Sequence, residues 1–201
     1  ILSFIIEFLT FWNDSFHYKI IISKNRFKIQ AFVISMSGMK INMNNIENVL
    51  ESLDSKTLRV CVIGIGRIGL PTALSFAQSG LQTIGVDINE NLVQNITSGK
   101  FPLKDEPGYE KIFNDVINEK KFSATTNIDE AVPNSDLILL SLPTPMDENN
   151  IPDYSALRIV ASKLSDILPP NSLVIVESTI EPGFIEDEMV SIISKSGRLE
   201  I

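Results

Sequence analysis

The sequence predicts an α/β protein with a doubly wound parallel sheet, incomplete at its carboxyl terminus and preceded by an extension outside the core. Two observations lead to this expectation. From residue 58 onward, short runs of apolar and β-branched residues alternate with segments of helical periodicity, a pattern typical of parallel sheets with right-handed crossovers. In addition, a glycine-rich turn joins the first apolar run to the first helix.

The predicted strands are the apolar runs that are too short to be helices. The first, residues 58–63, is apolar on both faces, so we expect it to be buried on both sides. Four later runs have the same character and cover residues 81–86, 123–126, 136–142 and 172–176.

The predicted helices are segments with apolar residues at helical spacing. Typical stop signals follow three of them, namely Gly80, Gly99 and the pair Pro169-Pro170. The helices cover residues 68–79, 89–97, 110–120, 154–168 and 186–194, and a shorter one over 46–53 precedes the first strand.

Charge and composition limit the possible partners. The 201 residues carry a net charge of −8, so we expect no nucleic-acid partner. One cysteine, Cys61, and one histidine, His17, cannot form a disulfide or a Cys/His metal site. We therefore expect a protein of the reducing cytoplasm, with no metal and no membrane partner.

The first 35 residues differ from the rest. They hold eight of the fifteen aromatic residues and four basic residues against two acidic ones. Residues 1–12 are apolar but too few to span a bilayer. We expect the extension to lie outside the fold, with a truncated signal or anchor and a genuine extra element as alternatives. The chain begins at Ile1, and methionines that could be the true start follow at Met36, Met39 and Met43. The predicted organisation is an extension over 1–35, a helix and linker over 36–57, and a truncated domain over 58–201.

The turn after the first strand has the spacing of a phosphate-binding loop. Gly64 allows a tight turn, Gly66 lets the backbone approach a pyrophosphate, and Gly69 lets the helix pack closely on the strand. The start of the helix offers N–H groups and the positive end of its dipole. The spacing is a weak signal alone, but here it joins a strand to a helix. The residues of this turn are Gly64, Ile65, Gly66, Arg67, Ile68 and Gly69.

An acidic residue, Asp87, closes the second predicted strand. It follows Gly64 by roughly 20 residues, the spacing of the acid that binds the adenosine ribose in dinucleotide sites. A carboxylate there repels the 2′-phosphate of NADP, so NAD is the predicted cofactor of a Rossmann-type domain. Arg67 could reach a phosphate or stack on a cofactor ring, but it is equally compatible with a solvated arginine.

Three further segments are expected near the ligand, because ligands of open α/β sheets lie over the carboxyl ends of the strands. Thr144 lies in a proline-rich loop after the strand over 136–142, and residues 177–179 follow the strand over 172–176. Residues 105–108 precede the helix that begins near 110. Serine and threonine after a strand are also common turn residues, so the segments are more informative together than singly.

Several of these segments resemble the nucleotide-sugar 6-dehydrogenase family. Order and spacing match over roughly residues 58–190. The matching segments are residues 62–73, 84–89, Glu106-Pro107, Leu142-Pro143-Thr144-Pro145, Pro152-Asp153 and Glu177-Ser178-Thr179. Three of them look most like the branch of the family that acts on UDP-N-acetylmannosamine, and the UDP-glucose branch is a near relative.

The resemblance implies an enzyme that oxidises the C6 alcohol of a UDP-sugar to a carboxylate with two NAD. A cysteine of the family carries a thiohemiacetal and then a thioester, which water hydrolyses. At the matching positions, the glycines of the turn and Asp87 would bind the cofactor, with Thr144 and Ser178 close to it. Thr179 would help to position the catalytic water, and Glu106 would lie in a loop near cofactor and substrate. The full enzyme would be a homodimer through regions outside this chain.

The departures from the family are as informative. The family's cysteine, lysine and asparagine lie on a later domain, and its glutamate lies just beyond residue 201. Cys61 sits within an apolar strand and is no substitute, because a buried thiol is inert. Arg67 stands where the family usually has an aromatic residue. We therefore expect this chain to bind NAD without turnover. A stand-alone NAD-binding module and a different Rossmann enzyme, such as a 3-hydroxyacid or 6-phosphogluconate dehydrogenase, are the alternatives.

Overall fold

The computed structural model describes residues 21–25, 28–32, 55–103, 108–170 and 172–196. The chain divides into two compact units, Ile1–Ser55 and Lys56–Ile201. In the first unit, strand β1 (Ile21–Asn25) pairs antiparallel with β2 (Lys28–Phe32), a pairing that we did not predict from the sequence. The short helix predicted over 46–53 lies outside the described residues.

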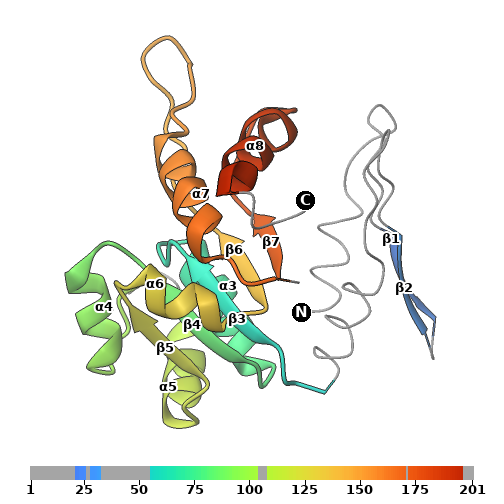
Figure 1. Ribbon diagram of the computed structural model, residues 1–201. Helices are drawn as coiled ribbons and strands as arrows, with labels where there is room; N and C mark the ends of the chain where they lie inside the picture. Colours follow the sequence, from blue (N-terminus) through green and yellow to red (C-terminus); the bar gives the residue numbers. More distant parts are fainter. Residues whose placement is uncertain (1–20, 26–27, 33–54, 104–107, 171, 197–201) are drawn as a thin grey trace. The chain divides into compact units, whose positions relative to one another are not determined.

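The second unit is built on a five-stranded parallel sheet (Figure 1). Its strands in chain order are β3 (Arg59–Ile63), β4 (Gln82–Val86), β5 (Phe122–Thr125), β6 (Leu137–Leu140) and β7 (Leu173–Val176). In space they run β5-β4-β3-β6-β7, and every neighbouring pair is parallel. The first strand is central, the chain moves outward to β5, and it then crosses back to β6. The order reverses between β3 and β6, so the predicted doubly wound fold is confirmed.

Helices connect the strands and cover both faces of the sheet. They are α3 (Gly69–Gln78), α4 (Glu90–Thr97), α5 (Tyr109–Asn118), α6 (Ile128–Ala131), α7 (Ser155–Ile167) and α8 (Val190–Ile193). Most predicted strands and helices end within two residues of their observed ends. The last predicted helix, 186–194, is instead a π-helical turn, Ile185–Met189, followed by α8. The four-residue helix α6 was not predicted.

The core explains why the strands are apolar. Residues Val60 to Ile63 of β3 and all four residues of β6 are buried. Side chains of a strand alternate between its faces. Cys61 and Ile63 join a cluster with residues of α7 and α8, and α3 packs on β3, β4 and α5. The edge strand β7 is less covered, since Leu173 is 42% exposed. Among the described residues, no helix has both the length and the apolar character that a membrane span requires.

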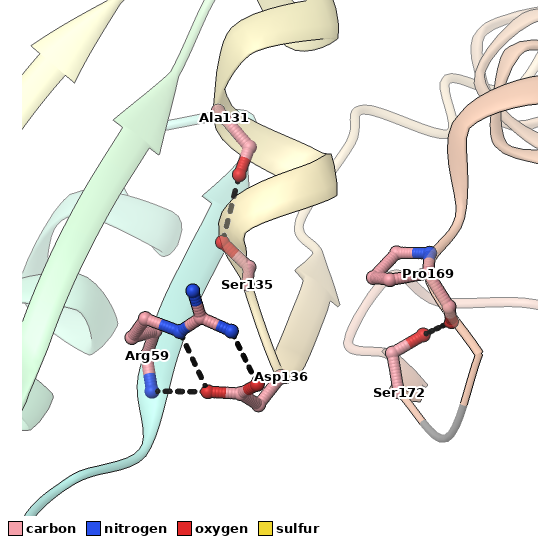
Figure 2. Close-up of polar contacts among 6 residues, drawn as sticks. All are labelled: Arg59, Ala131, Ser135, Asp136, Pro169 and Ser172. Carbon is pink, nitrogen blue, oxygen red and sulfur yellow. Dashed lines mark hydrogen bonds and ion pairs between the residues drawn. The ribbon is translucent and has the colours of Figure 1, made fainter.

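Polar contacts close the edge of the sheet where the strands begin. The guanidinium of Arg59 at the start of β3 donates two hydrogen bonds to the carboxylate of Asp136, at 3.0 and 2.8 Å, and its backbone N–H donates a third (Figure 2). Ser135 and Ser172, which precede β6 and β7, donate to the carbonyls of Ala131 and Pro169. The hydrogen bonds from Arg59 lower the pKa of Asp136. This amino-end edge is therefore held by contacts that the protein makes with itself.

Candidate functional site

The opposite edge, where the strands end, contains the predicted site residues that the structure describes. The glycine-rich turn leaves the carboxyl end of β3, Asp87 follows β4, and the loops with Thr144 and Thr179 follow β6 and β7. These ends flank the point at which the strand order reverses, between β3 and β6. That point is where open α/β sheets bind their ligands. Figure 1 shows the segment between β6 and α7 projecting beyond the sheet.

Gly64 and Gly69 are required by the packing of the turn itself. Gly64 has a φ of +87°, which other residues rarely adopt. A Cβ on Gly69 would overlap the carbonyl oxygen of Gly64 and lie 3.1 Å from the Cβ of Ser141. Because the Gly64 carbonyl is backbone, no change of side-chain rotamer would relieve that overlap. The turn is therefore packed tightly between α3 and the end of β6.

Gly66 has a different explanation. It is exposed, its φ is not in the left-handed region, and a Cβ built on it would meet no atom of the described residues within 4 Å. Neither its backbone conformation nor its packing against the described residues requires a glycine there. A backbone that must approach a bound phosphate closely does require one. The open space over Gly66 therefore fits a pyrophosphate.

The start of α3 fits the same ligand. The N-terminal residue that caps α3, Ile68, has no side-chain hydrogen bond to the helix, and the first turn contains no acidic residue. In α4, by contrast, the side chain of Asn89 accepts the N–H of Leu92, and Glu90 lies in the first turn. No side chain caps α3, but the N–H of Leu70 already donates to the carbonyl of Gly66 at 3.1 Å, and Pro71 has no N–H. An anion would therefore meet the N–H groups that precede Leu70 and the positive end of the helix dipole.

Asp87 holds the turn in place. Its Oδ2 accepts the backbone N–H of Ile65 at 3.0 Å, and its Oδ1 accepts that of Asn89 at 2.9 Å. The Asp87 side chain therefore joins the end of β4 to the glycine-rich turn. Each carboxylate oxygen can accept a further hydrogen bond, so the contact with the adenosine ribose stays a prediction. The structure adds a second role that the sequence did not indicate.

The other residues of the turn differ in exposure. The side chain of Ile65 is fully buried, so only its backbone lies at the turn surface. Ile68 is 63% exposed, and Arg67 is also exposed. Contacts of Arg67 and Ile68 with a cofactor remain predictions.

Ser178 joins the loops after β6 and β7. Its Oγ accepts the N–H of Leu142 at 2.9 Å and donates to the carbonyl of the same residue at 2.8 Å. The hydroxyl that we expected near the cofactor is thus occupied by the neighbouring loop. Thr144 is partly buried and Thr179 is exposed, and their predicted roles stay predictions. Glu106 lies outside the described residues.

Glu177 is the least satisfied polar side chain of this edge. Its Oε1 accepts a hydrogen bond of 3.0 Å from the hydroxyl of Thr72 in α3. Its Oε2 is buried and has no hydrogen-bond partner in the described part of the chain. The sequence pointed to Glu177 as a polar residue after a strand and as part of a segment that resembles the family. Thr72 lies in another such segment, residues 62–73, but neither segment indicates that these two side chains meet.

A second contact that sequence reasoning missed lies at the start of α7. The hydroxyl of Tyr154 accepts the backbone N–H of Glu181 at 2.9 Å, and the ring of Tyr154 packs 4.2 Å from that of Phe184. These contacts hold the segment that follows Thr179. The sequence identified Tyr154 only as the start of the predicted helix over 154–168, whereas the structure buries its side chain, which is 4% exposed.

Cys61 does not belong to the site. It is fully buried in the middle of β3, and burial raises the pKa of its thiol to about 12. The reactive form of a cysteine is the thiolate, so Cys61 is no nucleophile, as the sequence predicted.

Comparisons with known proteins agree with this geometry. Residues 58–200 match the profile of the UDP-glucose/GDP-mannose dehydrogenase family, NAD binding domain. A UDP-N-acetyl-D-mannosamine dehydrogenase from Campylobacter jejuni is 39% identical over 129 residues, which are 64% of this chain and 30% of that protein. An NDP-N-acetyl-D-galactosaminuronic acid dehydrogenase from Ralstonia nicotianae is 33% identical over 135 residues, 67% of this chain and 31% of that protein. The chain thus spans about 30% of the length of these relatives.

Solved structures show the same likeness. The UDP-N-acetylmannosamine dehydrogenase of Pyrococcus horikoshii superposes with a TM-score of 0.65 at 32% identity, over 71% of this chain and 34% of that one. The GDP-mannose dehydrogenase of Pseudomonas aeruginosa gives a TM-score of 0.66 at 28% identity, over 70% and 33%. The fold, the phosphate-binding turn and the family match over most of the chain agree. The chain therefore belongs to the UDP-glucose/GDP-mannose dehydrogenase family and carries that family's NAD-binding domain.

Proposed function

We propose that this chain supplies the NAD-binding part of an enzyme that oxidises the C6 hydroxyl of UDP-N-acetylmannosamine to the uronic acid. The observation that carries the choice of sugar is the set of relatives. Six of them, 33–39% identical to this chain, are UDP-N-acetyl-D-mannosamine dehydrogenases. UDP-glucose remains the alternative substrate within the same family.

In this proposal, different residues at the carboxyl ends of the strands bind different parts of NAD. The turn around Gly66 and the start of α3 hold the pyrophosphate, and Asp87 accepts the hydroxyls of the adenosine ribose. Thr144 and Ser178, which follow β6 and β7, would border the other half of the dinucleotide. When bound, NAD accepts the hydride removed from the sugar.

Thr179 and Glu106 are the residues proposed to act beyond cofactor binding. Thr179 is exposed after β7, where a hydroxyl is free to orient the water that releases the product. Glu106 is assigned to the loop between cofactor and substrate on the strength of the family match alone. The catalytic thiol is supplied by a residue other than Cys61, and the homodimer and cytoplasmic location expected from the sequence belong to the same proposal.

The test uses the natural gene product, purified from cells. With NAD in excess, two NADH per UDP-N-acetylmannosamine are expected, with little NADH from UDP-glucose or UDP-N-acetylgalactosamine. A preference for either of those sugars would overturn the choice of substrate. NAD binding without NADH formation from any UDP-sugar would instead favour a binding module without catalysis.

A further inference from the structure

One side-chain hydrogen bond joins two parts of the carboxyl edge that lie far apart in the sequence. Thr72 is in the first turns of α3, three positions after Gly69, and Glu177 is the residue that follows β7. The Thr72 hydroxyl lies 3.0 Å from Oε1 of Glu177. The bond therefore links the helix that begins at the glycine-rich turn to the loop that carries Thr179.

Glu177 is bonded to several elements and can therefore fix their relative positions. Its backbone N–H donates to the carbonyl of Leu140 at 2.9 Å, which fixes it to the end of β6. The next residue, Ser178, is bonded through its hydroxyl to both the N–H and the carbonyl of Leu142. Glu177 and Ser178 together thus connect α3 with the loops after β6 and β7.

The Thr72 hydroxyl has a single proton, and two acceptors compete for it. The carbonyl of Ile68 lies at 3.2 Å and the Glu177 carboxylate at 3.0 Å. Hydrogen bonds to a charged acceptor are stronger than those between neutral groups. Because Oε2 of Glu177 is buried and has no hydrogen-bond partner among the described residues, loss of the Thr72 hydroxyl would leave neither carboxylate oxygen with a side-chain donor in that part of the chain. The Thr72 hydroxyl is therefore expected to donate to Glu177 and not to the carbonyl of Ile68.

We propose that Glu177 is a positioning residue for the cofactor. By holding the start of α3 at a fixed distance from the loops after β6 and β7, it makes the pyrophosphate site and the site for the nicotinamide half one rigid surface. Asp87 anchors the glycine-rich turn from the end of β4, so loss of the Glu177 contact should affect the nicotinamide half more than the adenosine half. The inference rests on the proposed mode of NAD binding.

The sharpest variant is Thr72→Val, which keeps the shape of the side chain and removes the hydroxyl. Thr72→Ser restores the hydroxyl. The matched control is Thr97→Val in α4, which likewise removes a threonine hydroxyl bonded to the carbonyl four residues earlier, that of Val93 at 2.9 Å. Glu177→Gln keeps an acceptor without the charge and should fall between wild type and Thr72→Val. Circular dichroism first establishes that each variant is folded at the temperature used.

Binding of NADH and of AMP then separates the two halves. We expect Thr72→Val to bind NADH about tenfold more weakly, equivalent to about 1.4 kcal/mol, and to bind AMP as the wild type does. The fluorescence of NADH bound to the wild type should differ from that of free NADH, because the protein holds the nicotinamide apart from the adenine. That of NADH bound to Thr72→Val should revert toward free NADH. Thr72→Ser and Thr97→Val should behave as wild type.

Three results would overturn the inference. Equal losses of NADH and AMP affinity would indicate a general structural role for the bond. Wild-type fluorescence like that of free NADH would mean that these loops do not order the nicotinamide half. Additive effects in the double variant of Thr72→Val and Glu177→Gln would mean that the two residues act separately. Wild type that binds neither NADH nor AMP would instead contradict the proposed function.

Discussion

The two edges of the same sheet are finished in different ways. At the edge where the strands begin, the carboxylate of Asp136 receives three hydrogen bonds from Arg59, and the nearby serine hydroxyls donate to carbonyls. At the edge where the strands end, α3 begins without a side-chain cap, Gly66 faces open space, and one oxygen of Glu177 has no partner in the described residues. The edge where the strands begin, which we call the complete edge, satisfies its own polar groups. The edge where the strands end, which we call the open edge, has polar groups that a ligand can bind.

This difference separates residues that hold the fold from residues that bind. Buried polar groups without partners cost free energy, and native proteins keep few of them. The one such side-chain atom among the described residues, Oε2 of Glu177, lies at the edge where the strands end, which is consistent with a site that a ligand completes. Changes at the complete edge should therefore affect stability alone, whereas changes at the open edge should affect binding, except where the turn packs on itself.

The largest effect is expected from Gly69→Ala, which tests that exception. The new Cβ would overlap the Gly64 carbonyl, so the free energy of unfolding should fall by about 3 kcal/mol or more. Urea denaturation followed by circular dichroism measures the change. A variant as stable as wild type would mean that the turn can relax and is not packed as described.

Gly66→Ala should give the opposite pattern. No atom of the described part of the chain lies within 4 Å of the new Cβ, so the free energy of unfolding should stay unchanged or rise slightly. The affinity for NAD should fall by about 2 kcal/mol, roughly thirtyfold, because the backbone can no longer approach the pyrophosphate closely. Calorimetric titration measures the affinity. Unchanged binding would place the phosphate elsewhere.

Asp87→Asn should weaken NAD binding by about tenfold, since a neutral amide accepts weaker hydrogen bonds from the ribose. NADP should raise the melting temperature of wild type less than NAD does, and this difference should shrink in the variant. The readout is the melting temperature with each nucleotide. Equal shifts by NAD and NADP in wild type would remove the argument for the ribose contact.

The smallest effect is expected at the complete edge. Arg59 stabilises the ionised form of Asp136 and lowers its pKa, so the pair stabilises the fold above the unfolded pKa of about 3.9. This contribution is lost as the pH falls through the lower folded value. The two side chains are 51% and 36% exposed, so Asp136→Asn should cost only about 1 kcal/mol at neutral pH.

The pH dependence and NAD binding provide the checks on that variant. The difference in unfolding free energy between Asp136→Asn and wild type should be full at pH 7 and should decrease as the pH is lowered below about 3.9. NAD affinity should not change. A loss of NAD binding in this variant would contradict the separation of the two edges.

Much of the α/β domain could be predicted because its signals are local. Apolar runs, helical spacing and stop residues gave the strands and most helices, and the glycine spacing located the turn. The antiparallel pair β1–β2 was missed because residues 1–35 were judged by composition. Polar and apolar residues alternate over 27–31, which includes part of β2 and none of β1. The helix α6 is only four residues long, too short for periodicity to be detected.

The contacts within the site could not be predicted for a different reason. Thr72 and Glu177 are 105 positions apart, and Ser178 and Leu142 are 36 apart. A sequence pattern shows which residue types follow a strand, but not which way their side chains turn. The carboxylate of Glu177 turns toward α3, and the hydroxyl of Ser178 turns toward Leu142. Only the packing of the helix and both loops determines these directions.

The buried thiol of Cys61 is a natural chemical probe of how often the domain opens. It is the single cysteine of the chain and lies fully covered at the centre of the sheet. A thiol reagent can reach it only when strand β3 is exposed, so labelling under native conditions proceeds through opening events. When reclosing is faster than labelling, the rate of modification measures the free energy of that opening without any denaturant. A ligand that binds where the strands end would slow the labelling of Cys61, and the size of this decrease would report the affinity of the ligand.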